Sequence, residues 1–298
     1  MPSEENCQDL SSSIRNNLPK NKAHLRKTIA EETLDFWNSK VQDLTVQGEF
    51  LKLLNEEKTA ITWQSVIYNV PKGVMFFVAR AATNSLATPD NLKRWGKIVS
   101  AKCPRCQNTH CTLHHILNNC HHMLERYTWR HNSVLQYMAK TLSDFNIPEN
   151  KVYADLPGWM INNSTIPQHI ITSSQRPDLV IVDQSRKIVS LLELTCSFER
   201  ETNFTNAHNR KLERYAALTS DIENRGFTVN LLPFEIGSRG LIRNQTKSDL
   251  LLCLKSQHSY KIGTKFFKDI SKMALLCSFS IYHSGQDPVW VDPPLLTP

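Results

Sequence analysis

The sequence lacks the features of a membrane or secreted protein. Its 298 residues contain no uninterrupted apolar run of about twenty, the length that spans a bilayer. The first twenty residues are polar and carry no apolar stretch of the kind found in signal peptides. We therefore expect no membrane partner and an intracellular protein, in which thiols stay reduced.

Charge of one sign is not strongly dominant either. The chain has 35 Lys and Arg against 28 Asp and Glu, which gives a formal net charge of +7. This moderate basic excess suits a polyanionic partner such as nucleic acid, but many basic proteins bind none. The charge alone decides little, so the function has to be sought in the motifs.

Cysteine and histidine are concentrated in one short window. Four of the eight cysteines lie between residues 103 and 120, and six of the eleven histidines lie between residues 110 and 131. Where thiols stay reduced, such a cluster indicates metal binding rather than disulfides.

The spacing within this window is that of a zinc motif, Cys103-x2-Cys106-x8-His115-x4-Cys120. Four Cys and His ligands with no open position describe a structural zinc site. His114 could replace His115, and the alternative without metal is a set of buried cysteines and exposed histidines. No Glu stands near the ligands where a catalytic zinc site would need its general base, so structural zinc is the preferred interpretation.

Helical patterns dominate the first part of the chain. One buried helix face is predicted by apolar residues at steps of three and four, Leu34, Trp37, Val41 and Leu44. Thr88 before Pro89-Asp90 predicts the start of another helix, with Thr88 as N-cap. A further helix is expected over residues 124–142.

Strand patterns begin after Arg176. Apolar runs at 179–182 and 188–194 predict a hairpin, and 227–236 a third strand, with helices at 203–223, 244–255 and 262–277. The chain is thus expected to be an α/β (α+β) protein divided into six segments. These are a disordered lead-in (1–21), a helical region (22–100), the zinc motif and following helix (101–145), a linker (146–175), a strand-containing domain (176–284) and a loose proline-rich tail (285–298).

The predicted hairpin brings two acids together. If residues 184–187 form the turn, Asp183 faces Ile188, and stepping outward one residue at a time places Asp178 opposite Glu193. Two carboxylates on one face, with β-carbons roughly 5 Å apart, repel each other unless a cation lies between them. Mg²⁺ accepts one or two carboxylates together with phosphate oxygens, so this pair is a candidate Mg²⁺ site. The alternative is that Glu193 lies at an exposed strand end and Asp178 only caps a turn.

Lys211 and Tyr215 follow on a predicted helix, where their spacing of four puts both on one face. An ammonium group beside the acids could orient water or neutralise phosphate charge. Lys211, together with Arg210 and Arg214, could equally form an ordinary solvated basic face.

The order of motifs along the chain resembles the C-terminal region of polyproteins of site-specific non-LTR retrotransposons. These have a CCHC zinc motif followed by a restriction-like endonuclease of the PD-(D/E)xK class. The resemblance covers about residues 30–285. Besides the zinc motif, it rests on Asn91–Gly96, Arg130-His131-Asn132, Arg176-Pro177-Asp178, Glu193-Leu194-Thr195, Lys211-x3-Tyr215 and Gly237-Ser238-Arg239-Gly240.

The resemblance implies a fold and roles for individual residues. The fold would be a restriction-endonuclease-like core with a helical N-terminal region and a small zinc knuckle. Asp178 and Glu193 would hold Mg²⁺ or Mn²⁺, Lys211 would be the catalytic lysine, Tyr215 its typical neighbour, and Arg176 a DNA contact.

The sequence departs from the family pattern in three places. The second acid is Glu193 where the family usually has Asp, and Thr195 stands where the wider class has its lysine, which in this family comes from the helix. The paired aspartates of a reverse transcriptase are absent. We therefore expect a truncated copy, a gene fragment or a stand-alone descendant, for which a polymerase-bearing full-length element is a possible protein partner.

Two functions fit these motifs. The first is a metal-dependent DNA endonuclease, acting in the nucleus on DNA and possibly bound to element RNA, with zinc as structural support. The second is a catalytically idle, zinc-containing, nucleic-acid-binding remnant of such an element. A third possibility is an unrelated α/β protein with accidental motifs.

Overall fold

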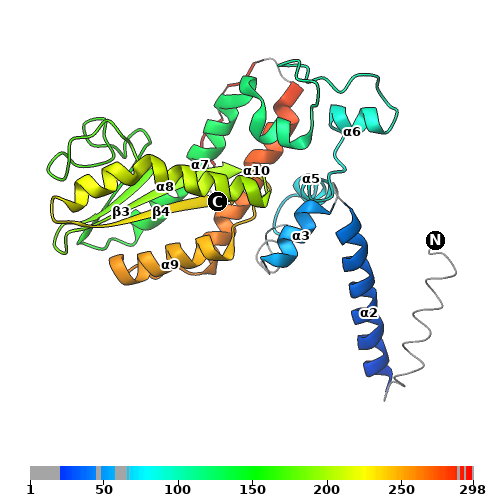
Figure 1. Ribbon diagram of the computed structural model, residues 1–298, viewed down its shortest axis with the longest axis horizontal. Helices are drawn as coiled ribbons and strands as arrows, with labels where there is room; N and C mark the ends of the chain where they lie inside the picture. Colours follow the sequence, from blue (N-terminus) through cyan, green and yellow to red (C-terminus); the bar gives the residue numbers. More distant parts are fainter. Residues whose placement is uncertain are drawn as a thin grey trace.

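The computed structural model describes residues 21–44, 48–57, 66, 68–286, 289–291 and 293–296 (Figure 1). The lead-in expected at 1–21 lies outside the described residues, except for Asn21. The helices are α2 (Lys22–Asp43), α3 (Glu49–Glu56), α5 (Lys72–Ala82), α6 (Pro89–Arg94), the π-helix η1 (His115–Asn119), the 3₁₀ turn η2 (His121–Met123), α7 (Leu124–Asp144), α8 (Glu201–Glu223), α9 (Asn244–His258), α10 (Thr264–His283) and the 3₁₀ turn η3 (Ser284–Gln286). Within the described residues, no helix is both long and apolar enough to cross a membrane.

A four-stranded mixed sheet forms the centre of the second half of the chain. Its strands are β1 (Asn150–Ala154), β2 (Leu179–Asp183), β3 (Ile188–Ser197) and β4 (Thr228–Gly237), in the spatial order β1-β2-β3-β4. The first three are antiparallel neighbours, whereas β3 and β4 are parallel and joined by the crossover helix α8. The expected mixture of helices and strands is confirmed.

Side chains alternate between the two faces of the sheet, and each face has its own helices. Leu192 and Leu194 of β3 pack in a core with α7, α9 and α10, whereas Val189 and Leu191 pack with Tyr215 and other residues of α8. Figure 1 shows α8 and α9 on opposite sides of the sheet. Since side chains alternate along a strand, Glu193 and Thr195 belong to the α8 face.

The predicted hairpin register is confirmed. Asp183 pairs with Ile188 and Leu179 with Leu192, so the turn is the expected four residues. Asp183 holds this turn, because its carboxylate accepts hydrogen bonds from Ser185 Oγ (2.7 Å) and from the backbone N of Arg186 (2.8 Å). These bonds outweigh burial and lower the pKa of Asp183 to about 2.

The predicted buried face of α2 is wrong. Leu34 and Trp37 are each 60% exposed, and α2 extends away from the rest of the molecule (Figure 1). Helical periodicity shows that apolar residues share a face, but it does not show that another element covers that face.

The segment expected to be a linker, 146–175, contains part of the sheet. Its residues 150–154 form β1, which pairs with β2, and Ile166 and Ile170 are fully buried beneath the α8 face. The prolines and asparagines of this segment mark turns between packed residues, which sequence reasoning mistook for an unstructured connection.

Part of the C-terminal tail that was expected to be loose contacts α7, although Val289 and Val291 are largely exposed. Trp290 lies edge-on to Trp129 with ring centroids 5.6 Å apart, and Trp129 Nε1 donates a hydrogen bond to Pro293 O (3.0 Å). Prolines fix extended backbone, and here that backbone follows α7.

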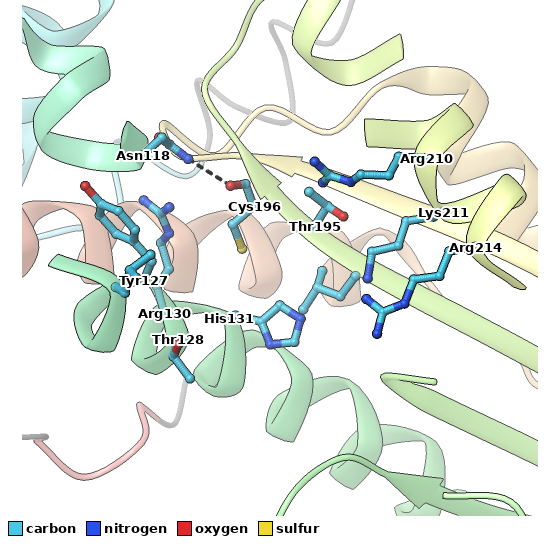
Figure 2. Close-up of a pocket in the computed structure, with 12 residues that line it drawn as sticks. Asn118, Tyr127, Thr128, Arg130, His131, Thr195, Cys196, Arg210, Lys211 and Arg214 are labelled. Atoms are coloured by element: carbon cyan, nitrogen blue, oxygen red, sulfur yellow. Dashed lines mark hydrogen bonds between the residues drawn. The ribbon is translucent and has the colours of Figure 1, made fainter. Parts of the chain in front are cut away.

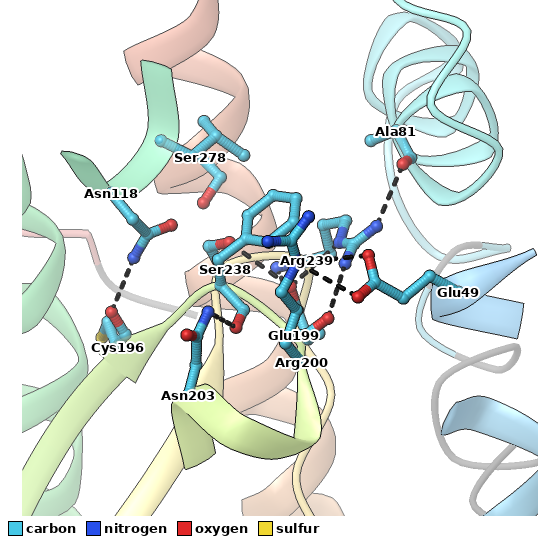
Figure 3. A network of polar contacts seen from close by, with 12 residues as sticks. Glu49, Ala81, Asn118, Cys196, Glu199, Arg200, Asn203, Ser238, Arg239 and Ser278 are labelled. Atoms are coloured by element: carbon cyan, nitrogen blue, oxygen red, sulfur yellow. Dashed lines mark hydrogen bonds and ion pairs between the residues drawn. The ribbon is translucent and has the colours of Figure 1, made fainter. Parts of the chain in front are cut away.

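A buried ion pair at the ends of β3 and β4 contacts the N-terminal helices (Figure 3). Arg239 Nε lies 2.9 Å from Glu199 Oε2, and both side chains are almost fully buried. The guanidinium is sandwiched between the rings of Phe50 and Phe198, at 3.8 and 4.3 Å from their centroids, and it donates to Ala81 O of α5 (3.2 Å). The helical region, the zinc segment and the sheet are therefore packed as neighbours, with α10 contributing to the cores on both sides.

Candidate metal centres and the carboxylate–lysine cluster

The four predicted zinc ligands converge. One donor atom from each of Cys103, Cys106, His115 and Cys120 lies within 4.8 Å of the others. Cys103 and Cys106 flank a tight turn, in which the backbone N of Gln107 donates to Cys103 O (3.0 Å), and η1 presents His115. Tyr127 holds the second ligand pair, because its hydroxyl accepts from the backbone N of Cys120 (3.1 Å) and donates to Ile116 O (2.8 Å). Three thiols and one imidazole with no position left open fit a structural zinc ion.

His115, and not His114, belongs to this group. His115 Nε2 lies 3.2 Å from Cys106 Sγ. His114 instead packs against the Phe198 ring, with centroids 4.8 Å apart, and burial lowers its pKa to about 4. Cys111 is buried nearby but is not one of the four converging residues.

A second cluster lies where β2 begins, beside the middle of β3, on the α8 face. It consists of Asp178, Glu193 and Lys211, hereafter the carboxylate–lysine cluster. Lys211 Nζ lies 3.0 Å from Asp178 Oδ2 and 2.7 Å from Glu193 Oε2, and the backbone N of Asp178 donates to Glu193 Oε1 (3.1 Å). The Glu193 side chain is fully buried, so the alternative of an exposed strand end is excluded.

The two acids have opposite electrostatic environments. Burial, and then the charge of Asp178, raise the pKa of Glu193, and Lys211 only partly offsets them. Burial would also raise the pKa of Asp178, but the hydrogen bond from His131 and the ammonium of Lys211 outweigh it, so that pKa is lowered. Glu193 therefore holds a proton more readily than Asp178 does. Acids with pKa values pushed apart in this way are typical of functional sites, although structural ion pairs produce the same effect.

The remaining predicted residues lie around this cluster in different ways. Tyr215 is buried, and its hydroxyl donates to the backbone O of Arg176 (3.3 Å), which ties α8 to the chain just before Asp178. The Arg176 side chain is half exposed and reaches Asp155, with 3.5 Å between Nε and Oδ1. Thr195, at the position where the wider class has its lysine, does not contribute a charge.

Sequence reasoning gave no role to His131. The structure places its Nε2 3.5 Å from Asp178 Oδ2, and this contact raises the pKa of His131 against the effect of burial. His131 comes from α7, 47 positions before Asp178 in the chain, and no local spacing signals such a contact. Only the resembling motif Arg130-His131-Asn132 pointed to this part of the helix.

Comparison with known protein families bears on the zinc segment. Residues 46–129 match a family described as zinc-binding in reverse transcriptase. The matched segment runs from before α3 into α7 and contains all four converging ligands. It covers less than a third of the chain, and no curated protein matches. The match and the ligand geometry together support zinc binding and relate this segment to proteins of retroelements.

Proposed function

We propose that this protein is a DNA endonuclease that hydrolyses phosphodiesters with Mg²⁺ or Mn²⁺ and uses zinc as structural support. The observation that carries the proposal is the convergence of Asp178, Glu193 and Lys211, which come from the residue before β2, from β3 and from α8. As the descendant of a retroelement, the protein would act on DNA in the nucleus, possibly together with element RNA and a polymerase-bearing partner.

The donor set fits a hard divalent cation. Asp178 and Glu193 offer carboxylate oxygens on one face of the sheet, next to an open cavity that includes Lys211 and His131 in its lining. Oxygen ligands from one or two carboxylates suit Mg²⁺, which when bound polarises a phosphoryl oxygen and lowers the pKa of water. Lys211 supplies only one positive charge to two acids, so the charged forms of both acids leave a negative charge that attracts a cation.

The residues themselves can serve the reaction in distinct ways. Lys211 lies between both acids and can hold them in place, or turn its ammonium toward a phosphate oxygen whose charge grows during attack. His131 can accept or release a proton beside Asp178. Glu193 would act as a ligand in its charged form, which a bound dication would favour against the effect of burial on its pKa.

The rival function is zinc-dependent nucleic-acid binding without cleavage. The same contacts favour it, because Lys211 already pairs with both carboxylates and His131 pairs with Asp178, so the acids have partners without a metal ion. A buried network of this kind can be structural.

The experiment that separates the two functions uses labelled single-stranded and duplex oligonucleotides with Mg²⁺. We expect cleavage by the zinc-loaded protein, and a loss of at least about a hundredfold in Glu193→Gln, since several kcal/mol of charge stabilisation disappear. Glu213→Gln, an exposed carboxylate change on α8, is the matched control and should cleave normally. Equal cleavage by wild type and Glu193→Gln would refute the proposed site, and binding without cleavage by wild type would establish the rival.

A further inference from the structure

An open cavity of about 500 Å³ borders the carboxylate–lysine cluster (Figure 2). It lies between the N-terminal half of α7, the end of β3 and the middle of α8. Lys211 and His131 belong to its lining and also contact Asp178, so they connect the cavity to the cluster. The full lining is Asn118, Leu124, Tyr127, Thr128, Arg130, His131, Leu194, Thr195, Cys196, Arg210, Lys211 and Arg214.

The charge of this lining has one sign. Four of its side chains are cations, Arg130, Arg210, Lys211 and Arg214, and none is an acid. Figure 2 shows Arg210, Lys211 and Arg214 extending from α8, across the cavity from Tyr127 and Arg130. Arg210 and Arg214 are exposed and form no ion pair with any described acid, so their charge is available to a ligand. A concave surface lined by one sign of charge concentrates counter-ions of the opposite sign.

Two hydrogen-bond donors in the lining have no acceptor among the described residues. These are Arg130 Nε and Thr195 Oγ1, both buried atoms. Arg130 is held in place by its other nitrogens, which donate to Ser278 Oγ and Leu117 O (both 3.0 Å), so Nε stays fixed. A buried donor without a partner costs about 1–3 kcal/mol, and a ligand rich in acceptor oxygens would remove that cost. The third unpartnered atom of the lining, Asn118 Oδ1, is an acceptor and does not contribute to binding an anion.

We propose that this cavity binds one phosphate group of the nucleic-acid substrate, next to the phosphate that faces the carboxylate–lysine cluster. The inference rests on the proposed function for its substrate class but concerns a separate subsite. Arg210 and Arg214 contact the phosphate oxygens from α8, Arg130 donates to them from α7 across the cavity, and Thr195 donates from β3 beside Arg210. The subsite positions the strand so that the neighbouring linkage lies at Lys211.

The test measures binding rather than cleavage, so that the two proposals fail separately. A set of short oligonucleotides carries a single neutral methylphosphonate linkage at each position in turn, and binding to the zinc-loaded protein is measured without added Mg²⁺. At one or two adjacent positions we expect wild-type affinity to fall roughly tenfold, as loss of a charge-assisted contact predicts. In the double variant Arg210→Gln/Arg214→Gln the penalty at those positions should shrink, because only Arg130 and Thr195 still contact the phosphate, while penalties elsewhere persist.

Two controls are needed, one for the loss of an arginine outside the cavity and one for the kind of phosphate that the subsite binds. Arg225→Gln removes an exposed arginine beyond the end of α8, outside the cavity, and should keep the wild-type pattern. Oligonucleotides with and without a 5′-phosphate, and competition by inorganic phosphate, show whether the subsite takes an internal linkage or a strand end. Either source supports the inference.

The inference is overturned if no methylphosphonate position depends on Arg210 and Arg214, if Arg225→Gln changes the pattern equally, or if the protein binds no oligonucleotide. Position-specific binding by a protein that does not cleave would support the subsite and refute only the endonuclease.

Discussion

Alternation along single strands decides which residues can meet at the cluster. Val180 and Val182 of β2 lie on the α8 face, so Asp178 continues the same face, and Glu193 follows Leu191 on β3 in the same way. Lys211 is one turn of α8 before Tyr215, which packs on that face. Asp178, Glu193 and Lys211 therefore meet because strand side chains alternate between faces and helix side chains repeat every 3.6 residues.

A buried histidine at the end of α9, which contacts two strands of the sheet, gives a pH-dependent stability. His258 is fully buried, with Nε2 2.7 Å from Ser190 Oγ and Nδ1 3.0 Å from Asn150 Oδ1. Burial, with a smaller contribution from the charge of Arg186 that Asp183 opposes, lowers the pKa of His258 from 6.5 to about 4.

This shift predicts destabilisation in mild acid. Between pH 6.5 and about 4, His258 of the unfolded chain binds a proton that the folded chain excludes. The contribution of His258 to stability is therefore fully present above pH 6.5 and is lost as pH falls toward 4. The contribution of His258 is up to ~3 kcal/mol. Urea unfolding at several pH values measures this. Between pH 6.5 and 4 the free energy of unfolding should fall by up to ~3 kcal/mol more in wild type than in His258→Gln. Parallel curves for the two proteins would contradict the prediction.

Among the elements, the zinc segment is the one whose stability depends most on a bound metal ion rather than on apolar packing. Its ligands come from a turn, a π-helix and the residue after that helix, so the ion joins three pieces of backbone with little regular structure. A structural zinc ion contributes folding free energy directly.

We expect one zinc ion per chain in the protein purified under reducing conditions. Cys106→Ser should lose zinc and unfold the segment around residues 101–123, because a thiolate ligand is removed. Cys111→Ser is the matched control, a buried cysteine of the same segment outside the ligand group, and it should retain zinc. Elemental analysis and circular dichroism provide the readout. Equal zinc content in the two variants, or none in wild type, would contradict the assignment.

The junction at the ends of β3 and β4 requires a glycine. A β-carbon at Gly237 would overlap the Glu199 carboxylate, which is held by Arg239 and by Ser238 Oγ. Gly237→Ala should therefore destabilise the protein by about 2 kcal/mol, as overpacking does. Gly285→Ala, where a β-carbon meets nothing within 4 Å, should stay within about 0.5 kcal/mol of wild type. Equal denaturation midpoints for the two variants would refute the junction's role.

Elements governed by local rules could be predicted from the sequence. The hairpin register followed from a four-residue turn, the Thr88 N-cap is observed with its side chain accepting from the backbone N of Asn91, and the zinc spacing identified its four ligands. Features that depend on distant partners could not be predicted. Elements far away in the chain decide four of them: the exposure of the apolar residues of α2, the pairing of β1, the packing of Trp290 and the contact of His131 with Asp178.

At the scale of the whole molecule, the zinc segment and the carboxylate–lysine cluster are joined by shared packing. α10 contributes Leu275 and Ile281 to the core around the zinc segment, and Ile270 and Met273 to the core beneath the sheet. Asn118 of η1 also donates to Cys196 O of β3 (2.8 Å), beside the cationic cavity (Figure 2). Loss of zinc should therefore disturb the cavity as well, which is why variants have to be compared at equal zinc content.

The central claim is that Asp178 and Glu193 form a cation-dependent site for phosphodiester hydrolysis. The most direct measurement is the nicking of supercoiled plasmid with Mg²⁺ or Mn²⁺ by wild type and Asp178→Ala, matched for zinc content. We predict that wild type nicks the plasmid and that Asp178→Ala loses nearly all activity, because charge stabilisation worth several kcal/mol is removed and each 1.36 kcal/mol is about tenfold in rate. Equal nicking by the two proteins, or none by either, would contradict the claim.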